Sequence, residues 1–251
     1  MSTGQVIHLE SVDSTNEYLK RRGALLPDGT VVVADHQTAG KGRLGRSWQD
    51  APGQSLLASW LLKSLQGDAL LLLPLAAGMA VLDALDSLGA QGANLKWPND
   101  IVEQRDGRCR KLGGILCEHR VGQQSFSVCG IGVNLLQPQE VFDGRGLPDA
   151  GSVQGVLGAP LKREELLRAI GQSLQKRCAQ AAAEPQALLQ DVSARCITLG
   201  RTVKIKTEAG EYTAFAARLD RDGQLICQTE EGEEIKVRAG EVSVRGLNGY
   251  L

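Results

Sequence analysis

The sequence has few aromatic residues and no clustered metal ligands. Phe, Trp and Tyr make up 4% of the 251 residues, so we expect a mostly aliphatic core. The 6 cysteines are scattered and no two have C-x-x-C spacing, which argues against a zinc site and a dense disulfide framework. We therefore expect reduced thiols in a cytoplasmic protein. The 3 histidines are isolated along the chain, and each is expected to be structural.

An excess of charge and a long hydrophobic span are also missing. The formal net charge is −1, which argues against a partner held by bulk electrostatics, and no binding to DNA is expected. No basic stretch followed by an apolar run opens the chain, so we expect no signal peptide. The longest apolar run, residues 69–82, contains Pro74 and is short for a bilayer. It predicts a buried helix and no membrane partner.

Apolar residues recur at helical or alternating spacing along the chain. Ser14 and Glu17 have the spacing of a capping box, and Gly23 is a candidate helix stop. Asp68 and Gly89 bracket the long apolar helix. Helices are expected over residues 14–22, 68–88, 161–183 and 185–195. Strands are expected over residues 6–9, 30–35, 55–62, 94–97, 101–103, 112–118 and 125–135.

The pattern changes near residue 197 to short alternating strands separated by glycine turns. Five short strands at about ten-residue spacing are typical of a small β-barrel. We therefore expect two domains, residues 1–196 and residues 197–251. The strands of the second domain are expected at residues 202–206, 211–219, 224–228, 234–238 and 242–245.

A glycine-rich basic segment, residues 35–48, is the most informative part of the chain. Its Gly40-x-Gly42-x-x-Gly45 spacing matches a dinucleotide fingerprint, but Pro52 and Gly53 follow where that fingerprint requires a helix. Three glycines with Lys41, Arg43 and Arg46 can instead surround an anion and order around it. A solvated basic loop without a ligand remains the alternative.

Four further polar clusters accompany this loop, and three of them also have a purely structural interpretation. Ser14 can be a helix cap, Lys111 a surface lysine beside other basic residues, and Asn99 with Asp100 an Asx-type turn. The clusters are Ser14-Thr15-Asn16, Lys96-Trp97-Pro98-Asn99-Asp100, Lys111-Leu112-Gly113-Gly114-Ile115-Leu116 and Gly130-Ile131-Gly132-Val133-Asn134.

With these five motifs in this order, the chain resembles the biotin protein ligase (biotin–acetyl-CoA-carboxylase ligase) family over essentially its full length. The resemblance implies an α+β catalytic domain, a mixed sheet flanked by helices of the class II synthetase-like biotin/lipoate ligase type, followed by a small C-terminal SH3-like β-barrel. Some relatives carry an N-terminal DNA-binding domain. Because the motifs here begin at Ser14, we expect the form without it.

The resemblance also implies the reaction. ATP activates biotin to biotinyl-5′-AMP, and the biotinyl group then passes to one lysine of a biotin carboxyl carrier protein. ATP and biotin are the substrates, Mg²⁺ is the metal, and the ligands of that metal are left unassigned. Two anions, a carboxylate and a phosphate, must meet in such a reaction, so fixed cations and backbone amides are required.

By resemblance, residues of this chain are assigned to three roles. Lys111 and Arg43 are the catalytic cations. The biotin site comprises Ser14, Thr15, Asn16, Gln37, Gly40, Lys41, Gly42, Arg43, Lys111, Gly113 and Gly114. The ATP and adenylate site comprises Arg43, Arg46, Trp48, Lys96, Asn99, Asp100 and Asn134.

Two positions depart from the family pattern, which often has arginine where this chain has Lys41 and Leu44. Lysine keeps the charge but loses the bidentate fork, so weaker anion contacts are expected at position 41. A lipoate–protein ligase and a non-enzymatic biotin sensor are the alternative functions. The sequence leaves the oligomeric state open between a monomer and a homodimer.

Overall fold

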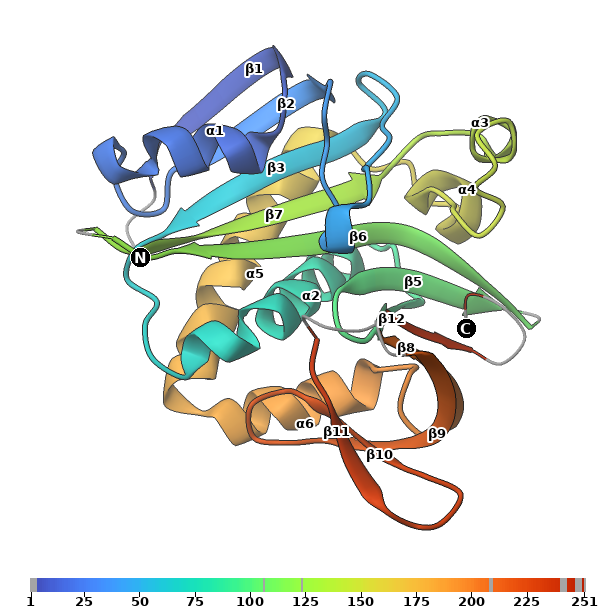
Figure 1. The fold of residues 1–251 in the computed structure, drawn as a ribbon. Coiled ribbons are helices and arrows are strands. Elements are labelled where there is room, and N and C mark those ends of the chain that lie inside the picture. The colour runs from blue at the N-terminus through green and yellow to red at the C-terminus, as the bar shows by residue number, and fades with distance from the viewer. Residues whose placement is uncertain are drawn as a thin grey trace.

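Two β-sheets organise the protein in the computed structural model, which describes residues 4–105, 107–122, 124–207, 210–239, 243–246 and 250 (Figure 1). The first sheet has seven strands in the order β1-β2-β3-β7-β6-β5-β4. Its strands are β1 (Val6–Val12), β2 (Val31–Gln37), β3 (Ser55–Leu62), β4 (Ala93–Lys96), β5 (Asp100–Arg105), β6 (Arg108–Arg120) and β7 (Phe126–Asn134).

This sheet is mixed because one connection is a crossover. Helix α1 (Thr15–Arg22) joins β1 to β2, which pair in parallel, whereas the remaining neighbours pair antiparallel. Successive side chains of β2 point to opposite faces of the sheet, as they do in any β-strand. Val32 packs with Leu19 of α1 on one face, and Val31 and Val33 join the main core on the other.

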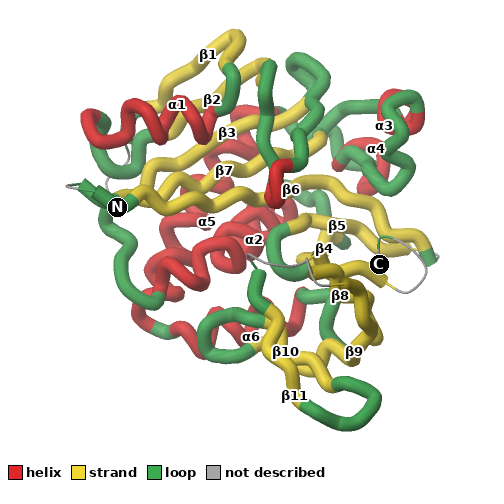
Figure 2. The backbone as a smooth tube through the Cα atoms, viewed as in Figure 1, coloured by secondary structure: helices red, strands yellow, loops and turns green. Residues whose placement is uncertain are grey.

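The main core lies between the sheet and helices α2 (Ala69–Ser87) and α5 (Arg163–Ala183), on the face opposite α1 (Figures 1 and 2). Helix α2 has the length and composition of a membrane span, yet 72% of its most apolar window is buried inside the protein. The predicted buried helix is therefore confirmed. Gly89 follows α2 with φ of 83°, so the predicted glycine stop is also correct.

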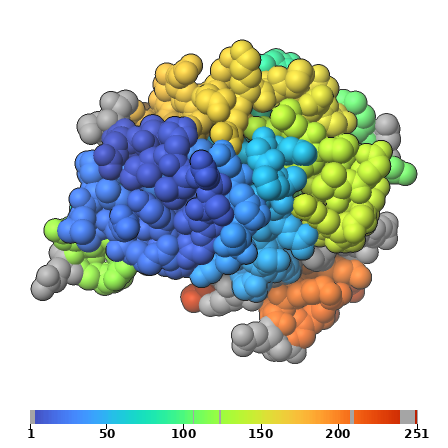
Figure 3. Space-filling view, turned by 90° about the horizontal axis from the view of Figure 1, so that it is seen from above, coloured from blue at the N-terminus to red at the C-terminus, as the bar shows by residue number. Residues whose placement is uncertain are grey.

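Two short helices, α3 (Gln139–Asp143) and α4 (Val153–Leu157), follow β7 and were not expected from the sequence. Each has only five residues, too few to give a readable periodicity. Figure 3 shows this yellow-green segment on the opposite side of the molecule from the blue N-terminal strands.

Helix α6 (Pro185–Arg195) leads to the second sheet, which has five strands in the order β11-β10-β9-β8-β12. The predicted barrel corresponds to this antiparallel sheet. The predicted fifth strand began at position 242, which lies outside the described residues. The strands are β8 (Arg201–Thr207), β9 (Gly210–Leu219), β10 (Leu225–Gln228), β11 (Glu234–Val237) and β12 (Ser243–Gly246).

The second sheet is tied to the first through Trp97, whose side chain is buried. The Trp97 backbone N–H donates to Thr198 Oγ1 at 3.0 Å, and its indole Nε1–H donates to the carbonyl of Gly223 at 3.0 Å. Both donors would otherwise be buried without partners, so the C-terminal segment completes the environment of the Trp97 turn.

The fold class predicted from the sequence is confirmed, but the predicted capping box at α1 is wrong. Ser14 occupies the N-cap position with extended backbone angles, yet its side chain makes no capping hydrogen bond. Glu17 contacts Lys20 and Lys41 instead of closing a capping box. The predicted stop at Gly23 is confirmed, because α1 ends at Arg22 and Gly23 is its C-cap, with φ of −58° and a 3-10 turn, Gly23–Leu25, following.

Candidate active site

The glycine-rich segment forms a small hairpin on the face of the sheet that carries α1 (Figures 1 and 2). The Gly42 N–H donates to the Arg46 carbonyl at 2.7 Å, and the Trp48 N–H donates to the Gly40 carbonyl at 2.9 Å. Its tip is a 3-10 turn, Arg43–Gly45, in which Leu44 has φ of 56°. No α-helix follows this described segment, so the dinucleotide interpretation was rightly rejected.

A cavity of about 520 Å³ lies under this hairpin, within the usual size range for small-molecule sites. Every residue assigned from the sequence lines it except Gly40 and Gly113. A Cβ at Gly113 would lie 2.7 Å from the Gly132 carbonyl oxygen, and one at Gly40 would lie 2.7 Å from the Trp48 carbonyl oxygen. These two glycines therefore allow close backbone packing beside the cavity.

One end of the cavity is lined by uncharged polar side chains. The Thr15 N–H and Oγ1–H both point to Gln37 Oε1, at 2.8 and 3.1 Å. Asn16 Nδ2 donates to the Leu116 carbonyl at 3.1 Å and to Glu118 Oε2 at 2.9 Å. Ser14, Thr15 and Asn16 are buried, so these groups are fixed before any ligand arrives.

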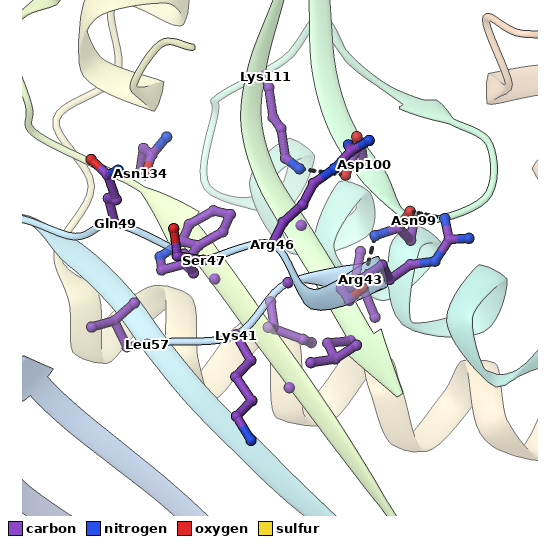
Figure 4. Close-up of a pocket in the computed structure, with 18 of the residues that line it drawn as sticks. Lys41, Arg43, Arg46, Ser47, Gln49, Leu57, Asn99, Asp100, Lys111 and Asn134 are labelled. Atoms are coloured by element: carbon purple, nitrogen blue, oxygen red, sulfur yellow. Dashed lines mark hydrogen bonds and ion pairs between the residues drawn. The ribbon is translucent and has the colours of Figure 1, made fainter. Parts of the chain in front are cut away.

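The other end carries fixed charge, centred on Lys111 of β6 and Asp100 of β5 (Figure 4). Lys111 Nζ lies 2.6 Å from Asp100 Oδ1, with side chains 30% and 15% exposed. Burial acts to raise the pKa of Asp100, but attraction to Lys111 and Lys96 outweighs it and lowers that pKa. The carboxylate is ionised, and the interpretation of Lys111 as a surface lysine is wrong.

Arg43 joins this cationic end from the tip of the hairpin. Its Nη1 donates to Asn99 Oδ1 at 2.9 Å, and Asn99 Nδ2 donates to the Ile115 carbonyl at 2.9 Å. Asn99 therefore bridges three segments and does not form a local Asx turn. Burial lowers the pKa of Arg43, and Arg46 lowers it further, while Asp100 opposes both. Two guanidinium groups thus face one small volume.

Lys41 is not part of that cationic group. Its Nζ lies 2.6 Å from Glu17 Oε1 on α1, and its side chain is 51% exposed. In Figure 4 Lys41 points away from Arg43, Arg46 and Lys111. The sequence grouped Lys41 with the two arginines, but the structure brings only the arginines together.

Glycines on β6 and β7 make the floor of the cavity flat. A Cβ at Gly132 would lie 2.8 Å from the Trp48 indole ring, and one at Gly114 would lie 3.4 Å from the same ring and 3.3 Å from Lys111 Nζ. At Gly130 a Cβ would lie 2.1 Å from Asn16 Oδ1. The sequence pattern Gly-x-Gly on β7 thus provides room for side chains from other segments.

Two buried polar atoms beside this floor have no hydrogen-bond partner within the described ranges. They are Trp48 Nε1, a donor, and Asn134 Oδ1, an acceptor. Asn134 Nδ2 is satisfied by the Gly151 carbonyl at 3.1 Å. Unsatisfied buried groups of this kind are uncommon in proteins, and here both line the cavity. They point to a flat ligand with its own donors and acceptors.

Three contributors were missed in the sequence. Ser59 Oγ lies 2.7 Å from Thr15 Oγ1 and 2.6 Å from Asn16 Oδ1, at the centre of the uncharged end. A lone serine inside the apolar strand β3 was a readable signal. Glu17 and Tyr250, which also contact site residues, had no such signal because their partners lie far along the chain.

Among the residues that the structure describes, no group of three or more His, Cys, Asp or Glu side chains could hold a metal ion. Among the described residues that line the cavity, Asp100 is the single carboxylate. The six cysteines are free, and burial raises the pKa of Cys178 to about 12. His36 Nδ1 lies 2.9 Å from Asp50 Oδ2, outside the cavity lining.

Comparisons with known proteins agree along the chain. The profile of the biotin/lipoate A/B protein ligase family matches residues 8–134, and that of the biotin protein ligase C-terminal domain matches residues 198–245. A biotin–[acetyl-CoA-carboxylase] ligase of Mycobacterium tuberculosis is 36% identical over 91% of this chain and 85% of its own length. A protein of the same name from Paracoccus denitrificans is 32% identical over 95% of this chain and 100% of its own length.

Solved structures give the same result. The structure described as biotin protein ligase from Aquifex aeolicus in complex with biotin and ATP superposes with a TM-score of 0.80. It is 30% identical in sequence, and the match covers 96% of this chain and 99% of that one.

Proposed function

The chain belongs to the biotin protein ligase family and has the activity of a biotin–[acetyl-CoA-carboxylase] ligase, and we propose how the residues of its cavity carry out that activity. One observation supports the assignment of roles. The cavity has an uncharged polar end and a cationic end, and Lys111 with Asp100 forms the centre of the cationic end. Biotin has a neutral ring system and a side chain that ends in a carboxylate. The ring system suits the uncharged end, and the carboxylate then approaches the triphosphate of ATP at the cationic end.

The uncharged end binds the ring system of biotin in this proposal. Ser14, Thr15, Asn16 and Gln37 offer neutral donors and acceptors, which a cyclic urea requires. Ser59 holds Thr15 and Asn16 in place. Because these side chains are already hydrogen-bonded to one another, little conformational entropy is lost when the ligand enters.

The cationic end binds ATP. Arg43, Arg46 and Lys96 face the phosphates, and Asn99 orients Arg43 through its 2.9 Å hydrogen bond. The adenosine group lies against Trp48 and Asn134, whose buried Nε1 and Oδ1 are otherwise without partners among the described residues. An adenine ring supplies a flat face for the Trp48 indole and an N–H donor for Asn134 Oδ1.

The first step of the reaction brings two anions together, the carboxylate of biotin and the α-phosphate of ATP. A carboxylate oxygen of biotin attacks the α-phosphorus of ATP, the bond to the β-phosphate oxygen breaks, and pyrophosphate leaves. Lys111 lies at the cationic end, beside Gly114 of the cavity floor, so its ammonium group offsets the repulsion and stabilises the charge that develops on the shared oxygens. In the second step a carrier lysine amine attacks the acyl carbon of biotinyl-5′-AMP, and AMP leaves with the bonding electron pair.

Mg²⁺ fits the donor set at the cationic end. Magnesium bound with nucleotides takes one or two protein carboxylates and completes its shell with phosphate oxygens and water. Asp100 is ionised, lines the cavity and stands among the groups assigned to ATP, so it is the side chain that would hold the metal. When bound, the metal neutralises phosphate charge and orients the leaving pyrophosphate.

The remaining assignments follow the same proposal. The acceptor is a biotin carboxyl carrier protein, and the enzyme acts in the cytoplasm, in agreement with its free cysteines. We place the domain boundary between residues 196 and 197. The first domain, residues 1–196, carries the catalytic cavity, and the second, residues 197–251, supports the Trp97 turn.

A substrate comparison tests the proposal directly. Pyrophosphate release from ATP is measured with biotin, with lipoate and with no acid, and a biotin carrier domain is then added and analysed by mass spectrometry. Release with biotin alone and one acylated lysine on the carrier are expected. Release with lipoate alone would move the assignment to a lipoate–protein ligase. Biotin binding without any release would make the protein a biotin sensor.

A further inference from the structure

Tyr250 contacts the cationic end of the cavity although it lies beyond the last strand of the second sheet. Its phenol O–H donates to Asp100 Oδ2, and its ring covers Lys96, with 3.9 Å between Lys96 Nζ and the ring centroid. Tyr250 also lines the cavity. Nothing in the five sequence motifs includes it, and the matched C-terminal family profile ends at residue 245.

The two residues that Tyr250 contacts are directly opposite each other. Lys96 ends β4 and Asp100 begins β5, and the two form a cross-strand pair at the base of the turn Trp97-Pro98-Asn99. One aromatic side chain therefore holds both members of the pair, the cation by its ring face and the anion by its hydroxyl. Asn99 belongs to this turn and accepts a hydrogen bond from Arg43. The contacts of Tyr250 at the base of the turn therefore also support the position of the Arg43 guanidinium group.

Both oxygens of Asp100 are engaged through this arrangement. Oδ1 accepts from Lys111 at 2.6 Å and Oδ2 accepts from Tyr250. With two donors on opposite oxygens, the carboxylate plane cannot rotate freely, although each oxygen keeps a second lone pair for another ligand. Lys96 is 5% exposed, so the position of its ammonium group is also restricted.

We propose that Tyr250 is a positioning residue for nucleotide binding: its hydroxyl fixes Asp100 and its ring fixes Lys96, which prepares the triphosphate end for ATP with its metal and leaves the biotin end unaffected. This inference rests on the proposed function, because that function makes Lys96 and Asp100 the groups that meet the triphosphate. The contacts of Tyr250 with Asp100 and Lys96 both lie at the cationic end.

Two substitutions separate the hydroxyl from the ring. Tyr250→Phe removes the hydrogen bond to Asp100 and keeps the ring over Lys96, whereas Tyr250→Leu removes both. In Tyr250→Phe we expect the Kd for a non-hydrolysable ATP analogue with Mg²⁺ to rise about tenfold, the usual worth of one hydrogen bond to a charged group. Tyr250→Leu should weaken the analogue further. Binding is measured by calorimetry without biotin, so the readout does not depend on turnover.

Two measurements distinguish positioning from general damage. The Kd for biotin alone and the rate of transfer from preformed biotinyl-5′-AMP to a carrier should stay within about twofold of wild type, because neither involves the triphosphate. Tyr212→Phe, an exposed tyrosine of β9, is the matched control and should change none of these values. If Tyr250→Leu unfolds, the comparison of Tyr250→Phe with wild type still decides.

Unchanged or tighter analogue binding in Tyr250→Phe would overturn the proposal, since the hydroxyl would then be irrelevant or obstructive. An equal loss of biotin and analogue affinity would overturn it as well. The wild-type protein is assayed for biotin-dependent pyrophosphate release beside the variants. Absence of that release rejects the proposed function, whereas a normal release with unchanged nucleotide binding in both variants rejects only the role of Tyr250.

Discussion

Lys41 and Glu17 form an ion pair, with 2.6 Å between Nζ and Oε1, that fastens the base of the glycine hairpin to helix α1. Glu17 Oε1 also accepts from Lys20 at 2.9 Å, and Lys20 lies 2.7 Å from Glu118 Oε1. Glu118 in turn accepts from Asn16 at 2.9 Å. These contacts therefore run without a break from Lys41 on the hairpin to Asn16, which lines the uncharged end.

Reversing this ion pair tests whether it holds the hairpin. Lys41→Glu should increase amide exchange across residues 40–48 without ligand, because two carboxylates then face each other. The double variant with Glu17→Lys should restore part of the protection by re-forming the pair. The effect on global stability should stay within about 1 kcal/mol, since the pair is partly exposed. Lys162→Ala, an exposed lysine paired with Glu165, is the control. Equal amide exchange in wild type and Lys41→Glu would show that the ion pair does not hold the hairpin.

The same cluster predicts that the free energy of unfolding depends on pH. Hydrogen bonds from Lys20 and then Lys41 lower the pKa of Glu17 from its ordinary value of 4.5. Because the folded pKa is the lower one, the stabilisation is complete above the unfolded value and is lost as the pH falls through the folded value. Between about pH 6 and about pH 3, wild type should therefore lose more free energy of unfolding than Glu17→Gln. Urea unfolding at each pH measures this, and parallel profiles for the two proteins would reject it.

Removing the charge of Lys111 should abolish adenylation. Lys111→Met keeps the length and the apolar stem, so we expect the rate of biotin-dependent pyrophosphate release to fall by about 10² to 10³, as when one transition-state donor is lost. Asp100 keeps Tyr250 and Lys96 nearby, so the protein should remain folded. Arg108→Met, at the exposed start of the same strand, is the control. A near wild-type rate in Lys111→Met would show that another cation carries the step.

A methyl group at Gly130 should disturb the uncharged end alone. The added Cβ would lie 2.1 Å from Asn16 Oδ1, so Asn16 must move and lose its contact with Ser59. We expect the Kd for biotin to rise at least about tenfold in Gly130→Ala, the loss expected for a displaced buried polar group. Binding of the ATP analogue should be unchanged. Gly122→Ala has no atom within 4 Å of the new Cβ and serves as the control. Unaltered biotin affinity in Gly130→Ala would mean that Asn16 does not contact the ligand.

The second domain should be necessary for a stable catalytic cavity. A chain that ends at residue 196 lacks Thr198 and Gly223, so both N–H donors of Trp97 lose their partners. Thr198→Val removes one acceptor with little change in shape and should lower the free energy of unfolding by about 1–3 kcal/mol. We expect the truncated chain to be less stable still and inactive in adenylation. Normal folding and biotinylation by the truncated chain would contradict this.

Local signals predicted most of the fold, and the contacts they missed are long-range. The predicted bounds of α6, residues 185–195, are correct, and the apolar run of residues 31–34 lies in β2, where a strand was predicted. The capping box failed because Glu17 pairs with Lys20, three positions along α1, and with Lys41, 24 positions away, and no local pattern reveals the second pair. For the same reason the position of Lys41 was misjudged.

Most residues assigned to the cavity were found because they occur in runs. Arg43 and Arg46 share one loop, and Asn99 and Asp100 share one turn, so a motif identifies each pair together. Ser59 is the one serine within the apolar run 56–62 of β3, and Tyr250 lies 150 positions from Asp100, so neither belongs to a motif. Only the folded chain shows that they contact motif residues.

The hydrogen bond from the Trp97 indole to Gly223 spans 126 positions of the chain, and this sets an order of events during synthesis. The turn that carries Asn99 and Asp100 leaves the ribosome long before its partner does. At about 5–20 residues per second, the gap is roughly 6–25 s. During that interval the nascent chain has its uncharged end but lacks a supported cationic end. We therefore expect no reactive acyl adenylate to form until the segment that stabilises its site has been translated.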